Sequence, residues 1–224
     1  MEFNEQQARW QYKLLGHEGF CTRLRSQDME NGHGNETLVE GEEAFIEWCK
    51  TLNGKRNLFI GRNPRDKKGN IIRATCVTLD IDPVRPAKEA SSELQHSAAL
   101  ELGRTILSVC GPGNLCSSGN GALLIFPLEQ PVTVDLDDFK IRCKLFEDSI
   151  RSDYETSNLK VDSTHDLARL LKVVGSVSTK GDRTQWRRAR FLHPPIFRVQ
   201  QSKLTGILRS FDISRESTTG LVLP

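Results

Sequence analysis

The chain has 224 residues, and its 31 Lys and Arg against 29 Asp and Glu give a formal net charge of +2. This near balance neither requires nor forbids a nucleic-acid partner, so the distribution of the charges matters more than their sum. No run approaches the roughly 18 apolar residues of a membrane helix, and the polar start MEFNEQQARWQYK lacks the apolar core of a signal peptide. These features argue against a membrane partner, and we expect a cytoplasmic protein.

Apolar periodicity and turn residues predict the following elements in chain order. Helices are predicted over residues 1–16, 42–52, 87–109, 135–153 and 165–171, with a possible last helix near the C-terminus. Strands are predicted over residues 19–25, 57–61, 74–82, 122–128 and 158–162, and near residue 190, while 26–37 is predicted to be a polar loop. In the helix over 87–109, Leu94, Ala98, Leu102 and Ile106 recur at four-residue steps. In the helix that Asp135 is expected to cap, the predicted buried stripe is Phe139, Cys143, Phe146 and Ile150.

Helices and strands alternate irregularly, and no internal repeat or low-complexity linker divides the chain. One α+β domain over residues 1–224, with a mixed or antiparallel sheet, is therefore the simplest interpretation. The six cysteines form no CxxC pair, and only Cys110 and Cys116 lie close together. Structural zinc usually takes closely spaced cysteine pairs, so we expect reduced thiols and no structural zinc.

The segment ATCVTLDIDP, residues 74–83, combines a buried strand pattern with two carboxylates. Side chains two apart on a strand share one face, so Asp80 and Asp82 leave the sheet together, about 7 Å apart. Two like charges there need compensation, and Pro83 ends the strand at a rim that a ligand can reach. Mg²⁺ and Mn²⁺ prefer carboxylate oxygens and are commonly shared with substrate phosphates. The pattern therefore indicates a metal site.

The strand by itself also allows an interpretation of the two aspartates without a metal. One aspartate would cap a turn, and the other would pair with Arg85 or Arg73. A third carboxylate strengthens the metal hypothesis, because the segment LKVD places Asp162 at the end of another short apolar strand. We predict that Asp80, Asp82 and Asp162 converge on one site.

Two further segments indicate phosphate chemistry. The turn SSGNG, Ser117 to Gly121, has glycines that leave backbone N–H groups free to hold phosphate oxygens, although Gly-Asn-Gly is also an ordinary hairpin turn. The segment KGDRTQWRRAR, residues 180–190, has five basic residues and Trp186, a composition that can follow a nucleic-acid backbone and stack a base. Its alternative is a solvated surface.

In order and spacing these segments resemble the archaeo-eukaryotic primase superfamily, and most closely the primase-polymerases of plasmids, phages and related mobile elements. LDID resembles the paired metal-binding aspartates of the first family motif, and SSGNGALLIF resembles the second. VDSTHDLARLLKVVGSVSTKGD resembles the third, and NLFIGRNPR lies where members carry a strand and an Asn-Pro-Arg turn. The resemblance covers about residues 20–190 and leaves 191–224 as a C-terminal extension.

The resemblance implies two abutting sheet units flanked by helices, one of them similar to an RNA-recognition motif, with the active site in the cleft between them. It implies two Mg²⁺ or Mn²⁺ ions, held by the three aspartates as catalytic residues. It also implies that the nucleotide lies near a set of seven residues: Ser118, Gly119, Asn120, Gly121, Arg169, Lys172 and Lys180. Nucleic acid would contact six arginines: Arg62, Arg65, Arg183, Arg187, Arg188 and Arg190.

The chain departs from the family pattern at two places. Members usually carry a phosphate-binding His two residues after the second Gly of the turn, where this chain has Leu123. In the third motif, Lys172 and Val174 stand where members often have Arg and Pro. These departures bear on nucleotide affinity.

The expected function is that of a template-dependent nucleotidyltransferase, a DNA primase or DNA polymerase that joins NTPs or dNTPs on single-stranded DNA with a primer. Such an enzyme would serve the replication of a plasmid, phage or other mobile element, with a replicative helicase as a possible partner or fused domain. Two alternatives are a catalytically weakened nucleic-acid-binding module, suggested by Leu123, and an Asp-x-Asp glycosyltransferase, in which the same motif holds a metal and a diphosphate.

Overall fold

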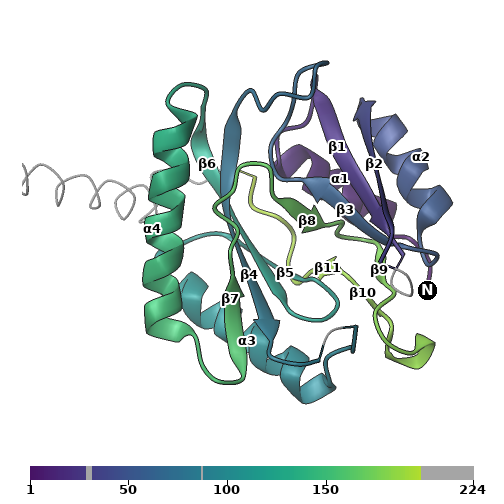
Figure 1. Cartoon of the computed structure of the whole chain (residues 1–224), viewed down its shortest axis with the longest axis vertical. Helices are drawn as coiled ribbons and strands as arrows, with labels where there is room; N and C mark the ends of the chain where they lie inside the picture. The colour runs from purple at the N-terminus through teal and green to yellow at the C-terminus, as the bar shows by residue number, and fades with distance from the viewer. Residues whose placement is uncertain (29–31, 87, 198–224) are drawn as a thin grey trace, which may run out of the picture.

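A computed structural model describes residues 1–28, 32–86 and 88–197 (Figure 1). The α-helices of this part are α1 (Glu5–Leu14), α2 (Glu42–Leu52), α3 (Glu93–Cys110) and α4 (Leu136–Tyr154), and η1 (Arg183–Gln185) is a short 3-10 helix. The first sheet has strand order β2 (Gly34–Glu40), β1 (Cys21–Gln27), β3 (Asn57–Gly61), β8 (Leu170–Lys172). The second has order β11 (Arg190–Phe191), β5 (Asn114–Ser117), β6 (Ala122–Val132), β4 (Ala74–Pro83), β7 (Leu159–Asp162). A small ribbon pairs β9 (Val177–Ser178) with β10 (Arg187–Arg188).

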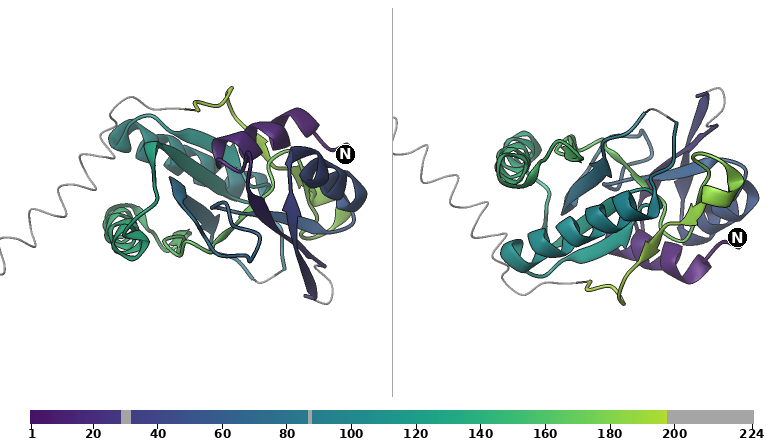
Figure 2. Two further views of the ribbon diagram at one scale, coloured as in Figure 1. Left: turned by 90° about the horizontal axis from the view of Figure 1, so that it is seen from above. Right: turned by 90° about the horizontal axis from the view of Figure 1, so that it is seen from below.

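Every strand pair among the described residues is antiparallel, so the expected α+β class is confirmed and these sheets are antiparallel rather than mixed. In the five-stranded sheet, β4, α3, β5, β6, α4 and β7 follow one another as a βαββαβ unit, with β4 in the interior between β6 and β7. Figures 1 and 2 show α4 and α2 at opposite ends of the molecule, with the two sheets between them.

Two apolar clusters lie on the two faces of β4. On one face, Val77, Leu79 and Ile81 pack against α3 and α4. On the other, Cys76 packs in a cluster that also contains Leu123 of β6 and side chains from α1, α2 and the first sheet. Because successive strand residues alternate between faces, Asp80 and Asp82 share the face of Cys76. The two sheets thus abut through this second cluster, and the aspartates lie on the side of β4 that faces the first sheet.

The helix α4 buries the predicted stripe of Phe139, Cys143, Phe146 and Ile150. Asp135 stands at its N-cap as expected, but with a left-handed backbone and no capping bond from its side chain. In α3 the predicted stripe is only partly confirmed: Ile106 is buried and Leu102 packs against the core, but Leu94 is 81% exposed. The buried residues of this helix are His96, Ala99, Gly103, Ile106 and Cys110. Strict four-residue steps drift by about 40° each on a 3.6-residue helix, so Leu94 and Ile106 face different ways.

Three other predictions are corrected. The helix predicted over 165–171 is absent, because residues 167–168 form a turn and Leu170–Lys172 pair with β3 instead. The predicted loop 26–37 contains the start of β2, which pairs with β1 along its whole length. The helix predicted from residue 87 begins at Glu93, where Ser92 and Gln95 form a capping box. The possible last helix lies outside the described residues.

All six cysteines are buried and free of disulfide bonds. Within the described part of the chain, the helices are too short or too polar to cross a membrane.

Candidate metal and nucleotide site

The three predicted carboxylates meet where β4 and β7 pair. Asp80 lies directly opposite Asp162 in the antiparallel register, and Asp82 lies opposite Lys160. One carboxylate oxygen from each of Asp80, Asp82 and Asp162 falls within 4.8 Å of the other two. Opposed residues of an antiparallel pair point to the same side, so all three side chains leave the sheet together. The predicted convergence is therefore confirmed as geometry.

The cluster is partly buried and only partly neutralised. Burial, and then repulsion from Asp82 and Asp162, raises the pKa of Asp80 to about 8. Arg169 Nη2 lies 3.9 Å from an oxygen of Asp80 and 3.9 Å from one of Asp162. Lys160 Nζ contacts Asp162 at 2.7 Å, and this contact raises the pKa of the lysine. The site thus still favours an added positive charge at Asp80.

This donor set fits a divalent cation. Mg²⁺ and Mn²⁺ take carboxylate oxygens, and they commonly keep open positions for water and substrate phosphates. Arg85 Nη2 also contacts Asp82 at 3.5 Å, so the ion pair proposed as the alternative to metal binding exists beside the cluster. Arg73 instead donates to the carbonyl of Gly16. One arginine on Asp82 leaves the raised pKa of Asp80 in place, which favours the metal interpretation.

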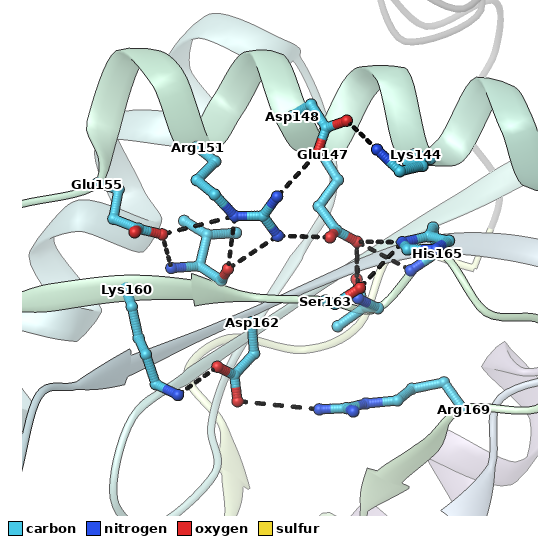
Figure 3. A network of polar contacts seen from close by, with 12 residues as sticks. Lys144, Glu147, Asp148, Arg151, Glu155, Lys160, Asp162, Ser163, His165 and Arg169 are labelled. Atoms are coloured by element: carbon cyan, nitrogen blue, oxygen red, sulfur yellow. Dashed lines mark hydrogen bonds and ion pairs between the residues drawn. The ribbon is translucent and has the colours of Figure 1, made fainter.

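A second layer of contacts holds the segment after Asp162 (Figure 3). Glu147 of α4 is 1% exposed, and its carboxylate accepts from the backbone N–H groups of Thr164 at 2.6 Å and His165 at 2.8 Å. Arg151 donates to the same carboxylate at 2.7 Å. Burial raises the pKa of Glu147, but these bonds outweigh it, so the net pKa is lowered and the side chain is charged. Glu147 therefore fixes the chain that leaves the metal site.

The glycine turn differs from the predicted phosphate nest. The N–H groups of Ser118, Gly119 and Gly121 bond within the turn, to the carbonyl of Gly121 and to the hydroxyls of Ser117 and Ser118. Asn120 is buried, and its amide bonds Ser91 and Ser178. A nest needs free donors, and these are satisfied internally.

The turn instead lies directly against the metal-site strand. A Cβ on Gly121 would stand 2.2 Å from the carbonyl oxygen of Ile81 and 2.7 Å from Asp82 Oδ1. The absence of a side chain at Gly121 thus lets the turn approach Asp82, and the hydroxyl of half-buried Ser118 stands in the same turn.

Two predicted phosphate ligands are held elsewhere. Arg62 is 0% exposed and donates to the carbonyl of Thr164 at 2.7 Å, so no exposed edge is left for nucleic acid. Lys172 Nζ donates to Asn57 Oδ1 and to the carbonyl of Val177, and burial lowers its pKa to about 7. Lys172 thus links β8 to β3 and β9, and Arg62 links the end of β3 to the segment after Asp162.

Lys180 is better placed than Lys172. It is half-buried, and its pKa is lowered first by burial and next by Arg85, while Asp82 and Asp162 act in the opposite direction.

Leu123 lies opposite Asp80 on β6 and is buried in the cluster between the sheets. The family position for His is therefore beside the cluster and is filled by an apolar side chain.

Of the remaining predicted arginines, Arg65 lies apart from the other four, which gather near Trp186. Arg65 bonds the carbonyl of Gly69 within its own turn. Arg187 is paired with Glu93 at 2.7 Å, and Arg183 lies over the ring of Trp186. Arg188 and Arg190 line a pocket beside α3. Nucleic-acid binding by these arginines therefore stays a prediction.

Sequence reasoning missed Lys160 and Glu147. Lys160 stands two residues before Asp162, so strand alternation alone puts both on one face. Glu147 had no comparable signal, because its partners lie 17 and 18 residues further along the chain.

The fold has clear counterparts among solved structures. The primase domain of the cyanophage S-2L primase-polymerase matches with a TM-score of 0.61 and 12% identity, over 93% of this chain and 98% of that one. The primase RepB′ matches with a TM-score of 0.58 and 12% identity, over 96% of this chain and 64% of that one. The chain has the archaeo-eukaryotic primase fold.

The polymerase domain of Mycobacterium tuberculosis Ligase D, solved in complex with DNA, has the same fold with a TM-score of 0.51 and 14% identity, over 96% of this chain and 90% of that one. No protein-family model and no curated protein sequence matches the chain. The chain spans about two thirds of the RepB′ chain but nearly all of the cyanophage primase domain. At these identities the primase fold is shared, and function must be argued from the site.

Proposed function

We propose that the protein is a template-dependent nucleotidyltransferase, a DNA primase or DNA polymerase that joins NTPs or dNTPs on single-stranded DNA. The observation that carries this proposal is the meeting of Asp80, Asp82 and Asp162 on paired strands of a primase fold, with Arg169 beside them. The catalytic domain would comprise residues 1–224, and its βαββαβ unit would be the part similar to an RNA-recognition motif. The active site would lie where the two sheets abut.

The three aspartates would hold two Mg²⁺ or Mn²⁺ ions. When bound, such ions neutralise phosphate charge and activate the attacking 3′-hydroxyl. Arg169 is free to turn from the carboxylates to a phosphate, since its contacts are 3.9 Å long and its side chain is 36% exposed. Lys180 and the hydroxyl of Ser118 would contact the triphosphate.

The template and primer would be bound by cationic residues of the segment 183–190 and by Arg65. A replication role in a plasmid, phage or other mobile element, with a helicase partner, follows from the likeness to primases and belongs to the same proposal.

Leu123 supports a second candidate, a nucleic-acid-binding module of primase type with weakened catalysis. Its buried side chain lies opposite Asp80, where a His would reach a phosphate. The complete carboxylate cluster favours the active enzyme over this candidate.

The test is synthesis on a single-stranded DNA template with labelled NTPs or dNTPs, Mg²⁺ or Mn²⁺, and template with or without primer. Activity that is lost in Asp80→Asn and Asp162→Asn supports the proposal. Absence of synthesis, with DNA binding retained, assigns the weakened module instead.

A further inference from the structure

A pocket of about 670 Å³ lies on the other face of the five-stranded sheet from the aspartates. Its walls come from Met1, from α3, from β5 and from the segment Thr184–Arg190. Ser117, which lines it, pairs with Ala122, and Ala122 pairs with Ile81. Ile81 alternates with Asp80 and Asp82 along β4, so the pocket and the metal site open on opposite faces. The volume is within the usual range for a small-molecule or nucleotide site.

The pocket carries positive charge that the fold leaves uncompensated. Three arginines line the pocket. One of them, Arg187, forms an ion pair with Glu93 and donates a hydrogen bond to the carbonyl of Gly119. Across residues 1–28, 32–86 and 88–197, no ion pair or side-chain hydrogen bond is formed by Arg188 or Arg190, and Arg188 Nε is a buried donor without a partner. Arg183 adds a further charge nearby, 5.5 Å from the ring centre of Trp186.

Neutral polar groups and an aromatic ring complete the lining. His96 Nε2 and Ser117 Oγ are 2.8 Å apart, and the same Ser117 oxygen accepts from the N–H of Gly119. Burial, and then the charge of Arg187, lowers the pKa of His96, so its imidazole is neutral at pH 7. Trp186 lines the pocket beside the arginines. Cations together with an indole ring are the combination that binds phosphate and base of a nucleotide.

The pocket is physically linked to the metal site. The turn Ser117–Gly121 has Ser117 at the pocket and Gly121 against Asp82. The segment that supplies the arginines starts at Lys180, whose charge interacts with Asp82. A single strand of nucleic acid bound along this segment would therefore reach both sites.

We propose that this pocket is a second nucleic-acid site, in which Arg188 and Arg190 bind phosphodiesters of a single strand and Trp186 stacks a base. The proposal rests on the proposed function, which it deepens by placing part of the strand on the face away from the metals. It differs from that function in one testable respect, since binding here needs no divalent ion.

The experiment measures oligo(dT) binding to the whole chain in EDTA, by anisotropy of the labelled strand and by quenching of tryptophan fluorescence. The chain has three Trp, and the other two, Trp10 and Trp48, pack against the apolar cluster between the sheets. We expect quenching in the wild type and its loss in Trp186→Phe. Arg188→Ala with Arg190→Ala should weaken binding tenfold or more and lower the slope of log K against log salt by up to about 0.7 for each charge.

Arg104→Ala is the matched control, because Arg104 is an exposed arginine of α3 that is paired with Glu101. Thermal unfolding of each variant excludes a folding defect. The proposal is overturned if the double variant binds no more weakly than Arg104→Ala, or if quenching persists in Trp186→Phe. If free dTTP quenches the fluorescence equally, the pocket binds a free nucleotide, and the proposal that it binds a single strand of nucleic acid is overturned. Loss of synthesis alone, with this binding intact, counts against the proposed function and leaves the pocket assigned.

Discussion

Asp80 destabilises the metal-free fold for the same reason that it suits a cation. A carboxyl whose folded-state pKa is raised to about 8, against about 3.9 in the unfolded chain, favours the folded state only while protonated. The ionised carboxyl of Asp80 therefore destabilises the folded state increasingly as the pH rises from about 4 to about 8. Since Asp80, Asp82 and Asp162 interact, the apparent pKa describes the three carboxyls together.

Asp80→Asn removes that charge and should stabilise the metal-free protein at pH 8 by about 1 kcal/mol or more, with a smaller gain at pH 5. Urea unfolding in EDTA at the two pH values measures the difference. Asp153→Asn, on the exposed surface of α4, is the control for the same chemical change. If Asp80→Asn raises the free energy of unfolding equally at both pH values, the raised pKa of Asp80 is contradicted.

Lys180 is the residue expected to take over the phosphate contact that Leu123 cannot make. A charged contact of this kind is worth about 1.4 kcal/mol or more, which is tenfold in affinity. Lys180→Ala should therefore weaken nucleotide binding at least tenfold in a titration with Mn²⁺. Lys172→Ala should leave affinity unchanged, because the Lys172 ammonium is bonded to Asn57 and Val177. If Leu123→His strengthens nucleotide binding strongly and Lys180→Ala has no effect on it, then this protein lacks the phosphate contact altogether.

The helix α4 reaches the metal site through Glu147. Removing a buried, bonded carboxylate leaves the donors of Thr164 and His165 without a partner, a loss that typically costs about 3 kcal/mol or more. Glu147→Ala should thus lower the free energy of unfolding by that amount. Glu147→Gln keeps the shape without the charge, and both variants should weaken Mn²⁺ binding because Asp162 loses its support.

Urea unfolding and Mn²⁺ titration check these two effects. Asp148→Asn, one residue along the same helix and 39% exposed, should change stability by less than about 1 kcal/mol. If Mn²⁺ affinity is unaffected in Glu147→Gln, the residue supports the fold alone.

The turn before β6 depends on a missing side chain. Gly121→Ala places a methyl group 2.2 Å from a backbone oxygen of β4, so turn or strand must shift. Stability should fall by about 1–3 kcal/mol, as for other overpacked sites, and Mn²⁺ binding should weaken with it. Gly34→Ala is the control, since its added Cβ meets only the flexible side chain of Arg25. Thermal unfolding with and without Mn²⁺ compares the two.

Both apolar clusters use β4, so the two sheets should unfold as one cooperative unit. A cation that binds only the folded state stabilises it by about 1.4 kcal/mol at ten times its Kd. Mn²⁺ should accordingly raise the Tm by roughly 3–6 °C in a chain of this length. Calorimetry checks both points, and the Mn²⁺ shift should vanish in Asp80→Asn with Asp162→Asn. A Tm shift that survives in that variant places the cation elsewhere.

Local pattern was sufficient for much of this protein. Strand alternation put Asp80 and Asp82 on one face, and the stripe of α4 was readable because its residues repeat at three and four positions. The opposite case is residues 165–171, whose helical pattern is overridden because Leu170–Lys172 add a fourth strand to the first sheet.

Distant pairing supplied the rest. That Asp162 lies opposite Asp80 depends on the register of β7, and that Arg62 is buried depends on carbonyls more than 100 positions away. Glu147 and the Arg188–Arg190 pocket likewise join segments that no periodicity connects. Side-chain direction along one strand is set by covalent geometry and is visible in the sequence. Which strands pair, and which charges they bury, follows from packing the two clusters around β4, so it emerges only in the folded chain.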